Sequence, residues 1–571
     1  MDTNPYDHLV SKHRLLSCHY ARIAAINNDD SRPSSLAGCI DESGELNDSK
    51  YREYLLMEEE LEKAEKEWFD TLKTMAVAST VHQSVPSKKK ARSKRTVKTL
   101  RPYYFDDNGE IVYLKPNQTF WYLVYVKTPP VQDDLWQKKF RRRFRLPYSE
   151  FLVMLGHLKT SGRFTRWYSR DGSGAKASPI ELLLLGALRY IGRGLTFDDL
   201  EEYTAINEET HRQFFHCFID FGAHYLYPMY VFYPKTATEF RPHQEEFNDG
   251  GLHGAGFSTD ATNVLLWRCS HNLKQSHIGF KNSHPARTYN LTCNHRRRIL
   301  HTTRGHPSRW NDKTLAWLDD FLCSLREGRI LQDVKFTLFE WREEIGGRIR
   351  HVRYRGAWGL CDNGYHRWSC TQAPGKNDML LSEKRLSQWI ESFRKDVECT
   401  FGILKGRFRI LKTGIRLEGV EAADKTWLTC CALHNMLLEV DGLDEHWEEG
   451  VPSDWEGELG NNNANEMSRF APFAIQRLQN PEAFGSRQHE RESAAPRPMF
   501  DIAPAQDGDN DSVGSAGTGE RSDGDGRIYV NSLSYSAFRD KLVQHFDILW
   551  RRHRIVWPRS ESSNRPVGTL N

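Results

Sequence analysis

Three acidic residues of the 571-residue chain have the type and setting that metal-dependent phosphodiester chemistry requires. Asp260 lies in an otherwise apolar and hydroxyl-rich segment that predicts a strand, and Asp362 ends a second predicted strand just before an Asn-Gly turn. Glu398 borders the apolar stripe of a long predicted helix, so its side chain should lie along the rim of the core. Two acids at adjacent strand ends and one on a helix packed over them would converge on a hard cation.

The chemistry that such a cluster supports is metal-assisted cleavage of a phosphodiester bond. Carboxylate oxygens bind Mg²⁺ or Mn²⁺ and leave coordination positions for water and phosphate. Two metal ions about 4 Å apart can activate an attacking hydroxyl and stabilise the leaving oxygen. Without metal, three buried carboxylates repel one another and their pKa values rise. Because the chain has 76 acidic residues, many other triples exist, and spacing alone does not establish the site.

The segments that would position these acids alternate between strands and helices, which is typical of a mixed α/β domain. We predict this domain over residues 251–440. Predicted strands cover residues 256–267, 289–293, 298–303, 334–339, 349–354 and 356–361, and predicted helices cover 312–326 and 382–408. The two aspartates therefore fall on strands and the glutamate on the long helix that follows them.

A helical and strongly basic domain is predicted ahead of it, over residues 136–250. From Trp136 to Arg170 there are ten Lys or Arg residues against one acid, a local charge of +9. Charge of this sign and density favours a polyanion as partner. Arg141, Arg142 and Arg143 lie in this stretch and are candidate contacts to DNA phosphates.

Three helices with short joints are predicted later in the same domain. The first has Ser178 as its cap, Pro179 at its first position and Glu181 to complete a capping box. Thr196 and Asn207 open the next two helices. Three helices of this size resemble a helix-turn-helix unit, and a plain three-helix packing unit without DNA contact fits the pattern equally well.

The two ends of the chain differ from this body. Residues 1–135 predict a largely irregular region with one helix at 51–75 and a basic cluster from Lys88 to Arg95. That cluster favours nuclear import, although a DNA-binding arm or a solvated charge run would have the same composition. Residues 441–530 predict an acidic disordered linker, since 444–530 contain eighteen acids against seven Arg, a net charge of −11. Residues 531–571 predict an amphipathic helix at 535–550 that packs back onto the body, and then a tail.

Composition also bounds the class of protein. The net charge of the whole chain is only +3, so the basic body and the acidic segment nearly cancel. Eleven cysteines without a CxxC pair indicate reduced thiols in an intracellular protein. No run of about 18 apolar residues predicts a membrane span, and the polar amino terminus is unlike a secretory signal.

Five segments carry motifs that can be compared with known families. They are GFSTDAT at 256–262, GHPS at 305–308 with NDK at 311–313, LCDNGY at 360–365, RKDVECTFGILKGRF at 394–408 and CCALHNML at 430–437. In this order, over roughly residues 136–440, they resemble the PIF/Harbinger superfamily of DDE transposases. The spacings between the three acids are 362 − 260 = 102 and 398 − 362 = 36 residues, which this resemblance accommodates.

The resemblance implies an RNase H-like catalytic domain in which Asp260, Asp362 and Glu398 are the catalytic residues and the ligands of two Mg²⁺ or Mn²⁺ ions. The reaction would be hydrolysis at transposon ends followed by strand transfer into a target. Implied partners are double-stranded DNA, a Myb-like DNA-binding protein and further copies of the chain. The family usually has His where this chain has Asn263, and Asn can form hydrogen bonds but cannot carry a proton.

Basic residues close to the acids are candidates for positioning DNA. Residues 281–310 contain seven Lys or Arg and no acid. The candidate phosphate contacts there and beyond Glu398 are Arg296, Arg297, Arg298, Lys405 and Arg407. Alternatively, the basic residues at 281–310 and those beyond Glu398 serve only to keep the protein surface soluble. Arg394, one turn before Glu398, is expected to orient that carboxylate, and His434 and Asn435 are expected to serve helix packing.

Two functions other than an active transposase remain open at this point. One is a domesticated, transposase-derived DNA-binding protein that does not cleave DNA, which Asn263 and the acidic segment favour and the intact triad opposes. The other is an interaction scaffold that works through the amino-terminal helix and the acidic segment, and only the charge pattern supports it.

Overall fold

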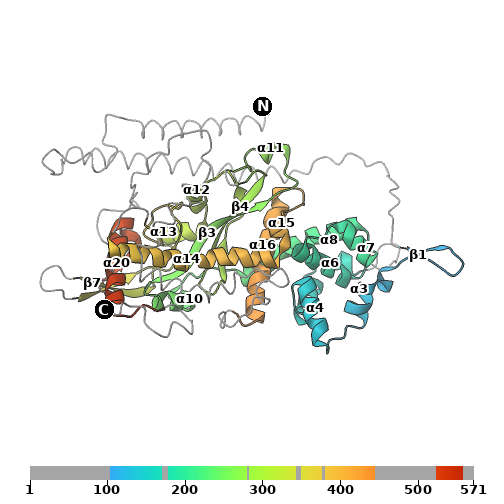
Figure 1. Cartoon of the computed structure of the whole chain (residues 1–571), viewed down its shortest axis with the longest axis horizontal. Helices are drawn as coiled ribbons and strands as arrows, with labels where there is room; N and C mark the ends of the chain where they lie inside the picture. Colours follow the sequence, from blue (N-terminus) through green and yellow to red (C-terminus); the bar gives the residue numbers. More distant parts are fainter. Residues whose placement is uncertain are drawn as a thin grey trace. The chain divides into compact units, whose positions relative to one another are not determined.

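The computed structural model describes residues 103–169, 178–279, 282–341, 349–375, 380–443 and 522–556, all of which belong to one compact unit (Figure 1). Among these residues no helix has the length and apolar character needed to cross a membrane. The predicted helix at 51–75, the basic cluster from Lys88 to Arg95 and the acidic residues 444–521 lie outside the described residues.

The centre of the unit is a six-stranded mixed sheet with strand order β10-β9-β3-β4-β5, in which β6 also pairs with β4. Its strands are β3 (Ala255–Leu265), β4 (Ala286–Cys293), β5 (Ile299–Thr302), β6 (His306–Pro307), β9 (Trp358–Leu360) and β10 (Thr371–Gln372). β4 runs antiparallel to β3 and β5, whereas β9 runs parallel to β3 and β10 runs parallel to β9. The predicted mixed α/β class is confirmed.

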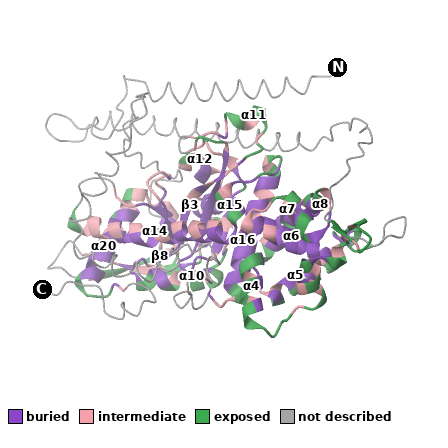
Figure 2. Cartoon of the chain, turned by 45° about the vertical axis from the view of Figure 1, so that its right-hand side comes forward, coloured by how far each residue is buried: buried purple, intermediate pink, exposed green. Residues whose placement is uncertain are grey.

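Helices cover this sheet, so its central strands are buried along most of their length. α14 (Leu381–Arg407) packs on β3 and β4, and α10 (Ala237–Asp249) also packs on β3. All eight residues of β4 are buried, and β3 is largely coloured as buried in Figure 2. A strand covered on both faces must satisfy its polar side chains internally, because water does not reach them.

The helix predicted over 312–326 is divided in two. α12 spans Asp312–Trp317 and α13 spans Asp320–Arg326. Between them the Asp319 carboxylate accepts hydrogen bonds from the backbone N–H groups of Phe321 and Leu322, each at 3.0 Å. Asp is a strong N-cap residue, so a second helix starts where periodicity alone predicts continuation.

Six helices of eight residues or more lie in the region predicted to be helical and basic. They are α4 (Asp134–Phe144), α5 (Tyr148–Thr160), α6 (Ile180–Arg193), α7 (Phe197–Thr204), α8 (Glu208–Phe221) and α10 (Ala237–Asp249). The predicted caps at Thr196 and Asn207 are confirmed. The predicted cap at Ser178 is wrong, because α6 begins at Ile180 and Pro179 takes the N-cap position, where its side chain accepts no hydrogen bond.

The hydrophobic core continues from these helices into the region of the central sheet. One cluster joins Phe140 of α4, Phe218 of α8, Tyr289 of β4 and Trp427 of α16 (Val420–Val440). Trp121 belongs to the same cluster, so the helical packing starts before the predicted boundary at residue 136. Burial of each such side chain contributes about 1.5–3 kcal/mol, which ties the two regions together.

A second sheet, of order β11-β8-β7, adjoins the end of the described chain. It consists of β7 (Lys335–Trp341), β8 (Ile349–Arg355) and β11 (Ile528–Tyr529). β11 lies within the segment predicted to be a disordered linker, so its last residues are ordered by pairing with β8. The predicted terminal helix is confirmed as α20 (Tyr535–Arg551), which packs on α14 and β7.

Candidate active site

Asp260 lies on β3, and Asp362 lies two residues past the end of the adjacent parallel strand β9. Ser258 of β3 pairs with Leu360 of β9, and each aspartate follows two residues further along its own chain segment. Alternate residues of a strand share a face, so this equal offset carries both carboxylates to the same place in the sheet. Asp362 is just past the end of β9, where its Oδ1 accepts a hydrogen bond from the backbone N–H of Gly364 at 2.8 Å.

The Asp260 carboxylate is largely buried and is held from two sides. Its Oδ1 accepts the backbone N–H of Ala261 at 2.7 Å, and its Oδ2 accepts a guanidinium N–H of Arg394 at 3.0 Å. Burial raises the pKa of Asp260 to about 6, the charge of Arg394 opposes this rise, and the charges of Asp362 and Asp312 add to it. Carboxylates that disfavour one another's ionisation in this way are stabilised by a shared cation.

Asp312 is a further carboxylate at this position, and sequence reasoning did not select it. A Cβ placed on Gly364 would lie 2.7 Å from Asp312 Oδ2 and 3.0 Å from Asp362 Oδ1, so the two carboxylates flank this glycine. Asp312 is the first residue of α12, whose N-cap is Asn311. The sequence signal that could have identified Asp312 is the pair Asn311-Asp312, which begins a helix between Asp260 and Asp362 in the chain.

Glu398 lies on α14 and is held by cations rather than by the aspartates. Arg394 donates to Glu398 Oε1 at 2.9 Å, and Lys395 Nζ lies 2.7 Å from Glu398 Oε2. The prediction that Arg394 orients Glu398 is therefore confirmed. The same guanidinium also reaches Asp260, so it links the acid of β3 to the acid of α14.

These carboxylates fit a hard divalent cation by the chemistry of their donor atoms. Asp260, Asp362 and Asp312 offer only oxygen, and they act on one another electrostatically. Within the described ranges, however, no three His, Cys, Asp or Glu side chains already surround a single metal position. In this arrangement Arg394 supplies the positive charge between Asp260 and Glu398.

Lys405 is a second cation on the same helix, seven residues beyond Glu398. Its Nζ donates to Thr262 Oγ1 at 2.8 Å, and Thr262 is on the same face of β3 as Asp260. Burial lowers the pKa of Lys405 to about 8. Lys405 therefore lies beside the acids with a hydroxyl as its hydrogen-bond partner, and a phosphate oxygen could replace that hydroxyl.

Asn263, where the resembling family usually has His, is directed away from the acids. It is three residues beyond Asp260 on β3, so its side chain lies on the opposite face of the strand. Its Oδ1 accepts the hydroxyl of Thr288 on the neighbouring strand. The replacement of His by Asn thus changes a contact between β3 and β4 and not the acid cluster itself.

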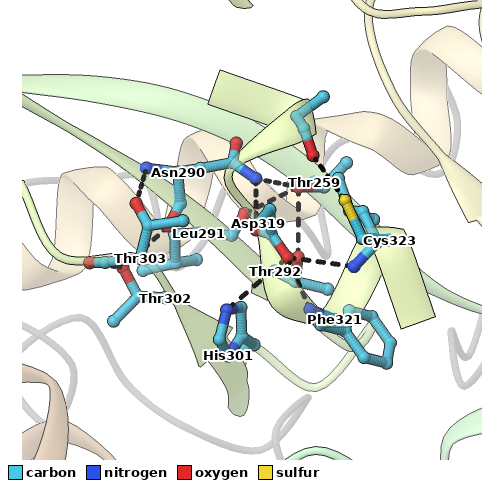
Figure 3. A network of polar contacts seen from close by, with 12 residues as sticks. Thr259, Asn290, Leu291, Thr292, His301, Thr302, Thr303, Asp319, Phe321 and Cys323 are labelled. Atoms are coloured by element: carbon cyan, nitrogen blue, oxygen red, sulfur yellow. Dashed lines mark hydrogen bonds and ion pairs between the residues drawn. The ribbon is translucent and has the colours of Figure 1, made fainter. Parts of the chain in front are cut away.

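A buried polar network lies behind β3, around Asn290 and Asp319 (Figure 3). Asn290 of β4 donates through Nδ2 to Thr259, the neighbour of Asp260, at 3.3 Å and to Asp319 Oδ2 at 2.7 Å. The hydroxyl of Tyr365, three residues after Asp362, donates to Asn290 Oδ1. The strand of one aspartate and the turn of the other are therefore positioned by a single amide.

Replacing Tyr365 by Phe should reduce the metal-dependent DNA cleavage expected of the acid cluster by about tenfold, because the variant releases the Asp362 turn from Asn290. The lost buried hydrogen bond should also reduce the free energy of unfolding by about 1–2 kcal/mol. Tyr354→Phe is the matched control, since this equally buried tyrosine donates at 2.6 Å to Glu340 in the second sheet. Chemical denaturation and cleavage rates would be compared, and an equal loss of cleavage in both variants would refute the positioning role.

The arginines predicted to contact DNA from residues 296–298 are engaged within the protein. Arg296 pairs with Glu245 at 2.7 Å and with Glu246 at 2.6 Å, and Arg298 pairs with Glu439 at 2.7 Å. Arg297 is fully buried, so its side chain cannot contact DNA in this conformation and that prediction is corrected.

Arg407 is also corrected from a DNA contact to an interior residue. It is 3% exposed, and its Nη1 lies 3.2 Å from His434 Nδ1. His434 Nε2 in turn bonds to the carbonyl of Arg297 at 2.9 Å, and Asn435 bonds to both the N–H and the carbonyl of Ile299. The predicted packing role of His434 and Asn435 is confirmed.

The arginines predicted in α4 have different surroundings. Arg141 forms a two-pronged ion pair with Asp441, at 2.7 and 2.5 Å. Arg142 and Arg143 are exposed, and Arg143 donates to the hydroxyl of Tyr125. Only these last two keep the open position that a phosphate contact requires.

Comparison with protein families gives the class of this site. Residues 259–435 match the family model described as DDE superfamily endonuclease, and this range includes Asp260, Asp362 and Glu398. The match supports a nuclease of the DDE transposase type, with DNA as the substrate that such a nuclease implies. Searches of curated proteins and of solved structures found no significant match.

Proposed function

We propose that this chain is a divalent-metal-dependent DNA endonuclease of the PIF/Harbinger kind, which cleaves transposon ends and joins them to a target. The observation that carries this proposal is the equal offset of Asp260 and Asp362 from Ser258 and Leu360, which pair on adjacent parallel strands inside the region that matches DDE endonucleases. The mixed sheet, with three antiparallel strands and a fourth parallel to the first, supports an RNase H-like fold for this domain.

In this function Asp260 and Asp362 are the catalytic metal ligands, Glu398 joins them from α14, and Asp312 lies close enough to support Asp362. Two Mg²⁺ or Mn²⁺ ions would supply activation of the attacking hydroxyl and stabilisation of the leaving oxygen. Arg394 keeps Asp260 and Glu398 facing each other across strand and helix. The buried network at Asn290 keeps the two aspartates level.

Lys405 has the position of a residue that binds the backbone phosphate next to the cleaved bond. It is on the face of α14 that meets Thr262, and its charge is only partly stabilised there. A phosphate oxygen is a stronger acceptor for an ammonium group than a hydroxyl is, so DNA would improve the surroundings of this lysine.

Replacing Lys405 by Met should weaken DNA binding and change how stability depends on pH. The folded-state pKa of Lys405 is about 8, below the value of 10.5 for an exposed lysine. The unfolded chain therefore binds more protons between these two pKa values, and this group makes the wild type more stable as pH rises from about 8 to about 10.5.

The Met variant should lack that gain, and below pH 8 it should be at least as stable as the wild type. Urea denaturation at several pH values and DNA-binding titrations would measure the two effects. A wild-type-minus-variant stability difference that stays constant from pH 7 to pH 10.5, or unchanged DNA affinity, would refute this role for Lys405.

The proposed function is tested by incubating the purified full chain with supercoiled plasmid in Mg²⁺, in Mn²⁺ and in a chelator. Nicked and linear products that form only with metal support it. Plasmid that remains intact while DNA is bound would favour a domesticated DNA-binding protein instead. That second candidate has one specific observation in its favour, which is that Arg394 already forms ion pairs with both Asp260 and Glu398.

Location and partners complete the proposal. The basic cluster from Lys88 to Arg95 supports import into the nucleus, where transposon DNA is present. A Myb-like protein for recognition of transposon ends and a second copy of the chain for pairing two ends follow from the PIF/Harbinger resemblance. Co-purification with a tagged second copy, with and without DNA, would test self-association.

A further inference from the structure

Three helices of the unit bring together arginines that the catalytic site does not use. They are Arg142 and Arg143 near the end of α4, Arg145 just after it, Arg189 and Arg193 on α6, and Arg409 at the start of α15 (Arg409–Thr413). α6 packs against both α4 and α15. Six like charges therefore converge on one region of the protein.

Arg145 is the most deeply placed of these residues. It is 4% exposed, and its side chain packs across Gly192 of α6, where an added Cβ would lie 2.6 Å from Arg145 Cγ. Its Nη1 donates to the carbonyl of Arg142 at 3.2 Å. Its Nε and Nη2 are buried, and the part of the chain that the structure describes offers them no hydrogen-bond acceptor. A buried guanidinium with unused donors is costly unless an anion accepts from it.

The neighbouring charges increase that cost. Burial together with the charges of Arg193, Arg189 and Arg142 lowers the pKa of Arg145 to about 10. Arg189 donates to the carbonyl of Arg143 at 3.0 Å, and its pKa is also lowered to about 10, first by burial and then by Arg193 and Arg143. Guanidinium groups remain protonated at neutral pH, so this repulsion persists in the folded protein.

We propose that Arg189, Arg193 and the exposed Arg409 form a binding site for a phosphate of the DNA backbone, next to the buried Arg145, whose charge adds to theirs. Guanidinium groups bind phosphate oxygens through paired N–H donors, and a phosphodiester would offset the repulsion among these arginines and the buried Arg145. This inference rests on DNA being the substrate of the proposed function, and it adds a second anchoring point away from the acids.

The position of α15 connects this phosphate site to the catalytic sheet. A Cβ on Gly194, at the end of α6, would lie 3.5 Å from Thr413 Oγ1 of α15. The carbonyl of Thr413 accepts the indole N–H of Trp267 at 2.6 Å, two residues beyond the end of β3. A duplex held at the phosphate site would therefore be anchored next to the strand that carries Asp260.

The test uses the full chain and a fluorescent duplex of arbitrary sequence, with binding measured over a range of salt concentrations in a chelator. The variants are Arg189→Gln and Arg193→Gln, which keep a long polar side chain and remove one charge each. Arg212→Gln is the matched control, because this exposed arginine of α8 is already paired with Glu209 at 2.5 Å.

Each of the two variants should weaken binding by roughly fivefold near 150 mM salt and reduce the slope of log Kd against log salt by about 0.9. The control should leave both quantities unchanged. Thermal unfolding without DNA supplies a second measurement, because it shows whether each variant is folded at the temperature of the binding experiment.

Arg409→Gln is a third variant, which keeps the test decisive if a variant of α6 does not fold. It should also reduce the slope of log Kd against log salt. Wild-type-like binding by Arg193→Gln and Arg409→Gln overturns the inference, even if the wild type cleaves plasmid. If the arginine variants bind more weakly but the wild type does not cleave, the phosphate site stands and the proposed nuclease function fails. A wild type that binds no duplex overturns both.

Discussion

Asp260→Asn and Asp362→Asn should each reduce metal-dependent DNA cleavage by at least about a thousandfold, which corresponds to about 4 kcal/mol of lost transition-state stabilisation. Each residue follows a paired residue of two adjacent parallel strands by two positions, so their carboxylates should offer oxygen donors to the same place. Asn keeps the size of the side chain and removes the negative charge that holds a divalent cation. Glu398→Gln should have a similar effect if the helix acid completes the site.

Cleavage would be measured as single-turnover nicking of supercoiled plasmid in Mn²⁺, with circular dichroism to verify folding. Asp320→Asn is the control, because Asp320 is an exposed aspartate in the first turn of α13. Asp260→Asn should retain its fold, since burial disfavours the charge that the substitution removes. Wild-type nicking by either folded aspartate variant would rule out the proposed catalytic site.

Asp319→Ala should reduce the free energy of unfolding by about 3–5 kcal/mol, the largest loss of stability that we predict. Asp319 is fully buried and accepts three hydrogen bonds, two from the first turn of α13 and one from Asn290. Its removal takes away a helix cap and leaves buried donors without an acceptor. Because Asn290 positions the aspartates, cleavage should also decline in whatever fraction of the variant remains folded.

Asp133→Ala separates the capping contribution from the buried network. Asp133 caps α4 in the same way, through the backbone N–H groups of Leu135 and Trp136, but it is exposed. Its replacement should cost only about 1 kcal/mol. Urea denaturation of both variants would show whether burial accounts for the difference, and equal losses would mean that the Asn290 network contributes little.

The placement of the acids could be predicted from the sequence because it depends on local patterns. Asp260 interrupts a segment with strand character, Asp362 precedes a turn, and Glu398 follows Arg394 by one helical turn. Each of these features involves residues close together in the chain. The pairing of β3 with β9, which makes the two aspartates level, required the structure.

The buried network could not be predicted because the sequence of β4 alternates polar and apolar residues. Thr288, Asn290 and Thr292 alternate with Tyr289 and Leu291, which is the pattern of a strand with one face in water. In the structure every residue of β4 is buried, and Asn290 bonds to Asp319 near α13. The polar face of β4 therefore meets the start of α13, where Asp319 is the N-cap. The periodicity of the sequence did not indicate this cap.

The basic residues show the opposite error. A run of three arginines at 296–298 looks like a phosphate-binding surface, yet Arg297 is buried and its neighbours pair with glutamates from distant helices. Arg145 and Arg193, by contrast, belong to segments 48 residues apart, and their charges meet only through packing of α6 against α4. A charge run can be seen in the sequence, whereas the meeting of charges from distant segments depends on the fold.

Binding of Mn²⁺ tests the central claim most directly, because it requires the acids to act together before any bond is cut. Electron paramagnetic resonance of the full chain with a short duplex would count free and bound ions in the wild type, Asp260→Asn, Asp362→Asn and the control Asp320→Asn. We predict saturable binding by the wild type and the control and its loss in both site variants. Equal binding by all four proteins, or none by the wild type, would contradict the assignment of these carboxylates as a metal-dependent nuclease site.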